Sequence, residues 1–397
     1  MSCPWGMNTQ FGVYEGPGAG GVALIPKFSA WFGKPPSRAM DFFANDTWES
    51  LESDAAWTCA CWGPAAGPVV PEMIFSLPLT VSGTPLADVA AGFHDNSFSS
   101  VAKSLLQYGW AKATIRIGWE FNGSWMPWAA VANPVGYVAA YRRVVGILRE
   151  AAGSNFTFDW CTSWGQNATA PDSVYPGDDV VDVIGMDVYN RYYTQALSAT
   201  AARWANLLAA PYGLNWLVSF AALHKKRISF PEWGTGEWTA GDGGTGGGDD
   251  PLFVTNMAAF MQANNVSYCC YWDINAGSYN ARVSDGEHPL SGTALKTAFS
   301  SPLTPPGPIL WIGAGQPSTE TSVSVNFSPP YQGGAADHFD ILIRPVAPWT
   351  VAASVKQVGT QPVPGLKPGT DYEVCVRAVN AAGPGTPSAP IALTTAP

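Results

Sequence analysis

The chain has 397 residues, more than one average domain, and 47% of them are hydrophobic, so the sequence can bury a large core. Its 20 basic and 30 acidic residues give a formal net charge of −10, which opposes binding to nucleic acid or to an anionic membrane surface. Charged residues make up only 13% of the chain whereas tryptophan occurs 18 times, and this composition favours a neutral, ring-shaped ligand over a polyanion.

The cysteines and histidines show no pattern of a metal site. Cysteine occurs seven times, never with the C-x-x-C spacing typical of zinc, and we expect neither a metal nor a cofactor. Most of the cysteines are expected to be buried thiols, and their oxidation state is left open. No apolar run reaches the roughly 18 residues that span a bilayer.

From about residue 10 to residue 300, short apolar runs alternate with amphipathic segments, a pattern typical of βα units around a parallel sheet. The predicted strands are Phe11–Tyr14, Ser37–Phe42, Met73–Leu77, Ala113–Trp119, Phe156–Cys161, Val180–Met186, Arg227–Phe230 and Ser267–Trp272. The predicted helices include Pro134–Ala151, Thr200–Leu208, Leu214–Leu223 and Leu252–Ala263. Eight such units predict an α/β fold, a (β/α)₈ TIM barrel over residues 1–301. The segment Thr58–Trp62 competes for the second strand.

Acidic and aromatic residues stand where several predicted strands end. They include Glu15, Asp159, Trp164, Asp187, Tyr189, Trp272 and Asp273. In a barrel these ends converge on the rim where catalysis takes place, so we expect the aromatic side chains to line one cleft. Asp159 and Asp187 are each predicted either to bind a sugar hydroxyl or to cap the next helix.

The segment Gly236–Asp250 is rich in glycine, and we expect it to be mobile on the rim. Three interpretations stay open: a surface insertion, a lid that gates the substrate, or an ion site formed by Asp242, Asp249 and Asp250. The last lacks the regular spacing of a calcium loop.

Prolines at 302, 305, 306 and 308 predict a stiff linker over residues 302–308. Beyond it, over residues 309–397, period-two strands without helices predict a small β-sandwich. Its expected strands are Ser322–Phe327, Phe339–Arg344, Tyr372–Val379 and Ile391–Thr394. The run from Gly365 to Tyr372 and the strand after it resemble a fibronectin type III domain, with Phe327 where that family has a core tryptophan. The resemblance implies that Tyr372 is a corner tyrosine, which supports folding.

A glutamate stands at the end of two predicted strands. Around the end of the fourth strand the sequence reads Arg116-Ile117-Gly118-Trp119-Glu120-Phe121-Asn122-Gly123-Ser124-Trp125-Met126-Pro127-Trp128, and around the end of the seventh it reads Phe230-Pro231-Glu232-Trp233-Gly234. Glycosidic bonds are broken by two carboxyl groups, one as acid and one as nucleophile or base. Tryptophan faces beside such an acid are suited to stack on sugar rings. The pair Glu120 and Glu232 therefore predicts glycoside hydrolysis.

Glutamates on strands four and seven resemble the hallmark of the clan A retaining glycoside hydrolases. Within that clan the motif around Glu120 looks like the acid/base motif of family 26, the β-mannanase family, and Gly12–Gly18 and Val183–Asn190 are similar to its strands one and six. The resemblance implies that Glu120 is the general acid/base and Glu232 the nucleophile. One residue departs from the pattern, because Trp119 stands where the family has a histidine that binds sugar.

The predicted substrate contacts are Arg116, Trp119, Trp125, Trp128, Asp187, Tyr189 and Trp272. Trp119, Phe121 and Trp125 are expected to raise the pKa of Glu120, and Arg116 and Tyr189 to keep Glu232 ionised. Asn122 is expected to support the loop.

The sequence therefore predicts a monomeric retaining endo-glycoside hydrolase whose partner is a mostly neutral polysaccharide. The substrate is β-mannan or, as Trp119 favours, a divergent bacterial or cell-surface glycan. We expect an extracellular or cell-surface location, although Met1–Gly6 lack the features of a signal peptide. The alternative is a non-catalytic glycan-binding protein, such as a virion adhesin, on the same scaffold.

Overall fold

The structure is a computed structural model that describes residues 9–397 except 64–69, 193–194, 239–244, 265, 278, 300–304, 310, 317, 329, 331–335, 337, 346–347 and 381–382, and only the backbone of residue 245. Residues 9–300 form one compact unit and the chain after residue 300 forms a second. The domain boundaries expected at residues 301 and 309 remain a prediction.

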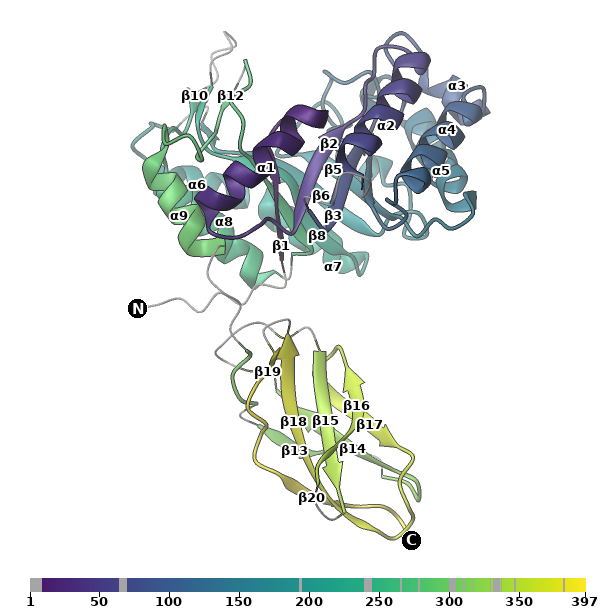
Figure 1. Cartoon of the computed structure of the whole chain (residues 1–397), viewed down its shortest axis with the longest axis vertical. Helices are drawn as coiled ribbons and strands as arrows, with labels where there is room; N and C mark the ends of the chain where they lie inside the picture. Colours follow the sequence, from purple (N-terminus) through teal and green to yellow (C-terminus); the bar gives the residue numbers. More distant parts are fainter. Residues whose placement is uncertain are drawn as a thin grey trace. The chain divides into compact units, whose positions relative to one another are not determined.

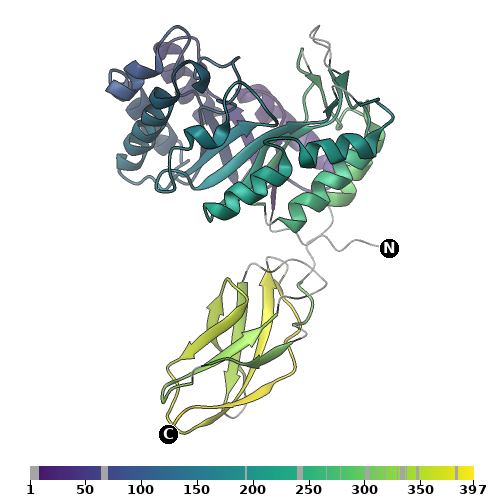
Figure 2. The ribbon, with the colours of Figure 1, turned by 180° about the vertical axis from the view of Figure 1, so that it is seen from behind.

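The first unit is a closed barrel of eight parallel strands with helices around it (Figures 1 and 2). The strands are β1 (Gln10–Tyr14), β2 (Arg38–Phe42), β3 (Glu72–Leu77), β4 (Thr114–Ile117), β5 (Thr157–Ser163), β6 (Val183–Tyr189), β8 (Arg227–Gly234) and β11 (Tyr268–Trp272), in the order β1-β11-β8-β6-β5-β4-β3-β2. Each matches one predicted strand to within a few residues. The predicted TIM barrel is confirmed.

The helices of this unit are α1 (Gly18–Phe32), α2 (Trp48–Trp62), α3 (Leu86–Ala91), α4 (Asp95–Gln107), α5 (Pro134–Glu150), α6 (Thr200–Ala209), α7 (Leu214–Leu223), α8 (Pro251–Ala263) and α9 (Pro289–Phe299). Two short 3₁₀ turns are η2 (Ala130–Ala132) and η3 (Pro171–Val174). Thr58–Trp62 is the last part of α2, so its alternative assignment as a strand is wrong. Thr47 starts that helix with a capping box in which its hydroxyl and the Ser50 hydroxyl bond each other's backbone N–H groups.

Two small antiparallel ribbons stand on the rim, and the sequence did not predict them. One pairs β7 (Arg191–Tyr192) with β10 (Thr245–Gly246), and the other pairs β9 (Glu237–Trp238) with β12 (Tyr279–Asn280). Glycine is required between them, since a Cβ on Gly236 would lie 1.7 Å from the Asn280 carbonyl oxygen. The described parts of the glycine-rich segment are therefore packed against neighbouring loops.

The candidate ion ligands of that segment have other roles or lie outside the described residues. Asp242 falls in the part that the structure does not describe. Asp250 caps α8 by accepting the N–H groups of Leu252 and Phe253, and Asp249 accepts those of Leu290 and Ser291 in α9. Among the described residues, no group of His, Cys, Asp and Glu could hold a metal ion.

The second unit has two antiparallel sheets. One orders β13 (Ile312–Ala314), β14 (Ser322–Phe327) and β17 (Gly359–Pro364); the other orders β16 (Thr350–Val355), β15 (His338–Arg344), β18 (Asp371–Asn380) and β19 (Gly383–Pro384), with β20 (Ile391–Thr394) beside β18. Four of these strands match the predicted ones. Phe327 is buried in the core against Phe339, and the Tyr372 hydroxyl accepts the backbone N–H of Lys367 at 3.0 Å. The predicted tyrosine corner is present.

The cysteines agree with the sequence-based expectation where the structure describes them. They are free thiols, all buried except the partly exposed Cys61. Across the same described residues, no helix is long and apolar enough to cross a membrane.

Candidate active site

The chain after β4 adopts a strained turn that presents Glu120. Gly118 and Glu120 both have φ near +52°, a left-handed conformation that costs a non-glycine residue on the order of 1–3 kcal/mol. The turn is fixed by two backbone bonds, from Gly118 N–H to the Leu77 carbonyl and from Glu120 N–H to the Cys161 carbonyl, both at 2.9 Å. Strain of this kind is found where function requires a particular side-chain direction.

The loop after Glu120 is clamped to β5. The Asn122 amide donates to the Ser163 carbonyl and accepts the Ser163 N–H, each at 2.8 Å, and Asn122 is fully buried. The expectation that Asn122 supports the loop is thus confirmed. Farther along, Trp125 is 53% exposed and its indole N–H donates to Glu120 Oε2 at 2.7 Å.

Glu232 lies near the end of β8, where both faces of the strand are buried. Its Oε1 accepts a hydrogen bond from Arg116 Nη1 and its Oε2 accepts one from the Tyr189 hydroxyl, both at 2.7 Å. The predicted contacts of Arg116 and Tyr189 with Glu232 are both present. These two donors fix the carboxylate in one orientation.

Arg116 lies inside the barrel with no exposed surface. Besides Glu232, it forms an ion pair with Asp187 and donates to the Ser76 hydroxyl. Burial opposes its charge, but the carboxylates of Asp187 and Glu232 outweigh that effect and raise the pKa of Arg116. A permanent positive charge therefore sits beneath two carboxyl groups.

The electrostatic setting of Glu120 differs from that of Glu232. Burial, followed by the negative charge of Glu232, raises the pKa of Glu120, while the hydrogen bond from Trp125 and the charge of Arg116 oppose the rise. Trp125 was expected to raise this pKa and instead lowers it, because its N–H bonds the ionised form. Burial and the nearby Glu232 likewise raise the pKa of the Tyr189 hydroxyl.

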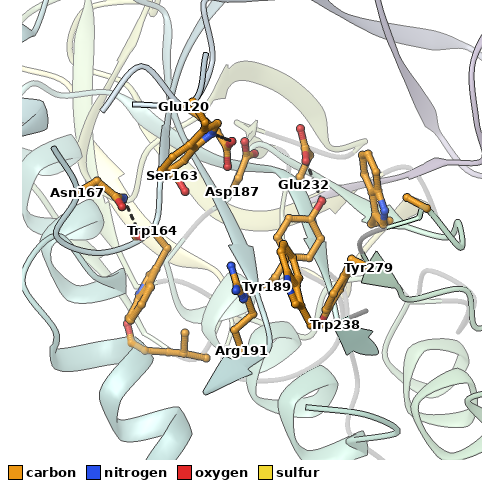
Figure 3. A pocket seen from close by; sticks show the side chains of 14 residues that line it. Glu120, Ser163, Trp164, Asn167, Asp187, Tyr189, Arg191, Glu232, Trp238 and Tyr279 are labelled. Atoms are coloured by element: carbon orange, nitrogen blue, oxygen red, sulfur yellow. Dashed lines mark hydrogen bonds between the residues drawn. The ribbon is translucent and has the colours of Figure 1, made fainter. Parts of the chain in front are cut away.

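Glu120, Asp187 and Glu232 open onto one pocket of about 600 Å³, a size typical of small-molecule and sugar sites. Figure 3 shows these three acids along one side of it, with Trp164 and Trp238 on opposite flanks. The other lining residues are Trp125, Ser163, Asn167, Tyr189, Arg191, Leu207, Trp272, Ala276 and Tyr279. Six of all these residues are Trp or Tyr, so the walls offer flat apolar faces.

Three predicted ligand contacts lie behind the pocket wall instead. Trp128 is fully buried, donates its indole N–H to the Trp119 carbonyl at 2.6 Å and packs against the Trp119 ring, so its assignment as a ligand contact is wrong. Arg116 is equally inaccessible, and its assignment is wrong for the same reason. Trp119 is only 7% exposed and packs its ring against Phe42 and near the Arg116 guanidinium.

Three other strand-end acids are buried away from the pocket. Asp159 accepts hydrogen bonds from the Ser229 and Tyr268 hydroxyls inside the barrel, so neither of its expected roles is present, and burial raises its pKa to about 6. Glu15 and Asp273 lie together at the ends of β1 and β11. Burial and the Asp273 charge raise the pKa of Glu15 to about 10, so Glu15 is neutral near pH 7.

Several residues that line the pocket were not predicted as site residues from the sequence, namely Ser163, Asn167, Arg191, Leu207, Trp238, Ala276 and Tyr279. Three of them, Arg191, Trp238 and Tyr279, stand on the rim ribbons. The Arg191 guanidinium lies 3.6 Å from the centre of the Trp238 ring, and that ring packs near Tyr279. Ribbons of two-residue strands leave no periodic signal in a sequence.

Comparison with known proteins identifies part of the barrel and most of the second unit. Residues 99–221 match the family model of glycosyl hydrolase family 26. Residues 312–394 match the fibronectin type III domain. Both resemblances found in the sequence are confirmed. The family 26 match contains Glu120, whereas Glu232 lies beyond its end.

Two curated proteins resemble shorter stretches. Endoglucanase H of Acetivibrio thermocellus is 32% identical over 117 residues, which are 28% of this chain and 13% of that protein. A mannan endo-1,4-beta-mannosidase of Bifidobacterium adolescentis is 27% identical over 182 residues, which are 42% of this chain and 18% of that protein. The matched part thus spans less than a fifth of either relative.

Solved structures share the fold over a much longer span. A Cellulomonas fimi endo-beta-1,4-mannanase double mutant covers 98% of this chain and 94% of its own, at 18% identity and a TM-score of 0.52. The catalytic domain of a Bacillus endo-beta-1,4-mannanase covers 74% of this chain and 86% of its own, at 17% identity and a TM-score of 0.50. At these identities the likeness concerns the fold alone.

Proposed function

We propose that this protein is a retaining endo-glycoside hydrolase that acts on a mostly neutral polysaccharide. The observation that carries the proposal is the pair of glutamates in one aromatic pocket with opposite surroundings. Glu232 is held by a guanidinium and a phenol, whereas Glu120 is a carboxyl whose pKa burial raises. Two carboxyl groups with divergent environments are the requirement for glycoside hydrolysis by acid and nucleophile.

In the first step Glu120 is the acid. Its proton passes to the glycosidic oxygen as the bond from that oxygen to the anomeric carbon breaks, and a Glu232 carboxylate oxygen forms a bond to the same carbon. The leaving sugar departs as an alcohol. A glycosyl ester on Glu232 and an ionised Glu120 remain.

In the second step Glu120 is the base. It takes a proton from water, the water oxygen attacks the anomeric carbon, and the ester bond to Glu232 breaks. Two displacements at one carbon retain its configuration. Tyr189 and Arg116 act on the leaving carboxylate of Glu232, because both donate to it in the resting site.

The pocket favours a neutral sugar chain as substrate. Aromatic walls stack on pyranose rings, and the Glu232 carboxylate would repel an anionic sugar. The two curated relatives are an endoglucanase and a mannan endo-1,4-beta-mannosidase, so glucans and β-1,4-mannan are the first polymers to test. Such polymers are too large to enter a cell, and we propose that the protein acts outside it.

The test is release of reducing ends from purified mannans, glucans, xylans, arabinans and bacterial cell-surface polysaccharides. We expect cleavage of at least one polymer, with Glu120→Gln and Glu232→Gln each slower by about 10³-fold or more. An NMR spectrum of the first-formed product distinguishes retention from inversion.

Trp164→Phe is the matched control for these variants, since Trp164 lines the same pocket and contacts neither glutamate through a hydrogen bond that the structure describes. Equal rates in the parent and both glutamate variants would refute the assignment. Binding on a glycan array without new reducing ends from any polymer would favour the alternative, a glycan-binding protein such as a virion adhesin.

A further inference from the structure

The ribbon of β9 and β12 connects the loop after Glu232 to the loop after β11. Trp238 pairs with Tyr279 and Glu237 pairs with Asn280. Because successive side chains of a strand point to opposite faces, Trp238 and Glu237 face different surroundings. Trp238 lines the pocket, as Figure 3 shows, and Glu237 reaches the buried side chain of His288.

His288 bonds acceptors on both sides of its ring. Its Nδ1 lies 2.8 Å from the Arg282 carbonyl oxygen and its Nε2 lies 2.7 Å from a Glu237 carboxylate oxygen, and the residue is only 1% exposed. A carbonyl and a carboxylate can only accept, so both bonds are made only when both ring nitrogens carry a proton. The geometry therefore requires an imidazolium ion.

The charges around His288 support that form. Glu237 approaches from β9, and Asp249 approaches from the loop before α8 while it caps the N-terminus of α9. Burial alone would lower the pKa of His288, but the bonds to Arg282 and Glu237 and the charge of Asp249 raise it overall.

The remaining charged groups nearby face other partners. On the His288 loop, Asp285 and Glu287 accept hydrogen bonds from the Asn275 amide. The Arg282 guanidinium is turned away, since its Nε donates to the Asp273 carbonyl and its Nη2 lies 3.9 Å from Glu15.

We propose that His288 is a positioning residue for the pocket: its bond to Glu237 holds the β9–β12 ribbon so that Trp238 forms the flank of the substrate site. The proposal rests on the proposed function only in that Trp238 contacts sugar. The hydrogen bonds to Glu120 and Glu232 come from Trp125, Arg116 and Tyr189, none of which is on the ribbon, so loss of the bond to Glu237 is expected to weaken substrate binding and to leave the chemical step nearly unchanged.

The pH dependence follows from the raised pKa of His288. Below the ordinary histidine value of about 6.5 the ring is protonated in the folded and unfolded states alike, and the bond to Glu237 contributes fully. As pH rises through the higher folded pKa, the ring loses a proton and the contribution disappears. Trp238 is therefore held firmly while the His288 ring is protonated, and less firmly once the pH exceeds the raised pKa of His288.

The first experiment reads the position of Trp238 without any substrate. The full chain is labelled with 5-fluorotryptophan, Trp238→Phe assigns the resonance, and ¹⁹F spectra are recorded from pH 5 to pH 10. We expect the Trp238 signal to titrate with a midpoint above about 6.5 in the parent, and to be displaced and independent of pH in His288→Gln. A signal that is the same in the parent and in His288→Gln would overturn the proposal.

The second experiment measures KM and kcat on whichever polysaccharide the panel shows to be cleaved. At pH 6 we expect Glu237→Ala and His288→Gln to raise KM by about two- to fivefold, a modest factor because the Glu237 side chain is 57% exposed, with kcat within about twofold of the parent. Glu237→Gln should restore most of the affinity, since its amide oxygen still accepts from Nε2.

A fall in kcat with unchanged KM would contradict a positioning role. If His288→Gln does not fold, the Glu237 variants decide the question alone, because Glu237 is on the surface. If no polysaccharide is cleaved, the proposed function fails while the ¹⁹F titration still tests the contact between His288 and the ribbon.

Discussion

Replacing Trp125 with phenylalanine isolates one contribution to the acidity of Glu120. The change keeps an aromatic ring and removes the indole N–H that donates to Glu120 Oε2 at 2.7 Å. That bond stabilises the ionised form and so lowers the pKa of Glu120, against burial and the charge of Glu232, which raise it. Without it the pKa of Glu120 rises further.

The size of the shift follows from the exposure of Trp125. A hydrogen bond to a charged group contributes roughly 1.5–3 kcal/mol when it is shielded from water. Trp125 is 53% exposed, so water replaces much of the lost bond, and about a third of that energy, roughly 0.5–1 kcal/mol, is a reasonable net value. At about 1.36 kcal/mol per unit, the pKa of Glu120 rises by about 0.4–0.7.

The assay is the pH dependence of kcat/KM on a cleaved polysaccharide. An acid catalyst must be protonated in the free enzyme, so its pKa sets the alkaline limb of the profile. We expect Trp125→Phe to move that limb to higher pH by about 0.4–0.7 unit. Trp164→Phe serves as control, because its indole N–H donates to the Leu207 carbonyl at 3.0 Å.

Two outcomes would refute the reasoning. One is an alkaline limb that stays in place or moves to lower pH in Trp125→Phe. The other is a shift of equal size in Trp164→Phe, which would mean that the limb responds to the pocket in general and not to the bond on Glu120.

Three further predictions concern stability. Below the ordinary carboxyl pKa, near 4, Glu120 is protonated in the folded and unfolded states, and as pH rises the unfolded state ionises first because the folded pKa is raised. In urea unfolding, the stability of Glu120→Gln relative to the parent should therefore increase from pH 4 to pH 7. The same difference in unfolding free energy at pH 4 and at pH 7 would contradict this. Arg116→Met should lose about 3–5 kcal/mol of unfolding free energy, because Asp187 and Glu232 lose their counter-ion. Adding Asp187→Asn should recover part of that loss. A loss below about 1 kcal/mol in Arg116→Met would be inconsistent with the buried ion pairs. Tyr372→Phe should destabilise the second unit by about 1 kcal/mol in calorimetry, because the hydrogen bond of the tyrosine corner is lost, and should leave polysaccharide cleavage unchanged. An unchanged unfolding transition of the second unit would argue against a stabilising role of this hydrogen bond.

Local sequence patterns were enough to locate the barrel strands and the elements that present its acids. Parallel strands buried on both faces, such as β3 and β8, read as short apolar runs, and the acids follow where those runs end. Glu120, Glu232 and Tyr189 could be placed on one rim for that reason, since the carboxyl ends of all eight strands meet there. Tyr372 was found by its own local motif.

The tertiary structure decided which of these side chains reach the pocket. Trp125 and Trp128 are three residues apart in one loop, yet the first is 53% exposed and the second is fully buried. The difference arises from the partners of each ring. The indole N–H of Trp128 donates to the Trp119 carbonyl and its ring packs against the Trp119 ring, whereas the indole N–H of Trp125 donates to the Glu120 carboxyl at the pocket. No pattern within the loop encodes that choice.

The sequence by itself thus determined the strands and helices of both units and the positions of the two glutamates at strand ends, because these features depend on neighbours within a few residues along the chain. Closure of the barrel determined the rest. It brought Arg116 beneath Glu232 across 116 residues and paired β9 with β12 to place Trp238 and Tyr279 in the pocket wall. Contacts between such distant segments depend on the completed fold, and a linear pattern of residues carries no record of them.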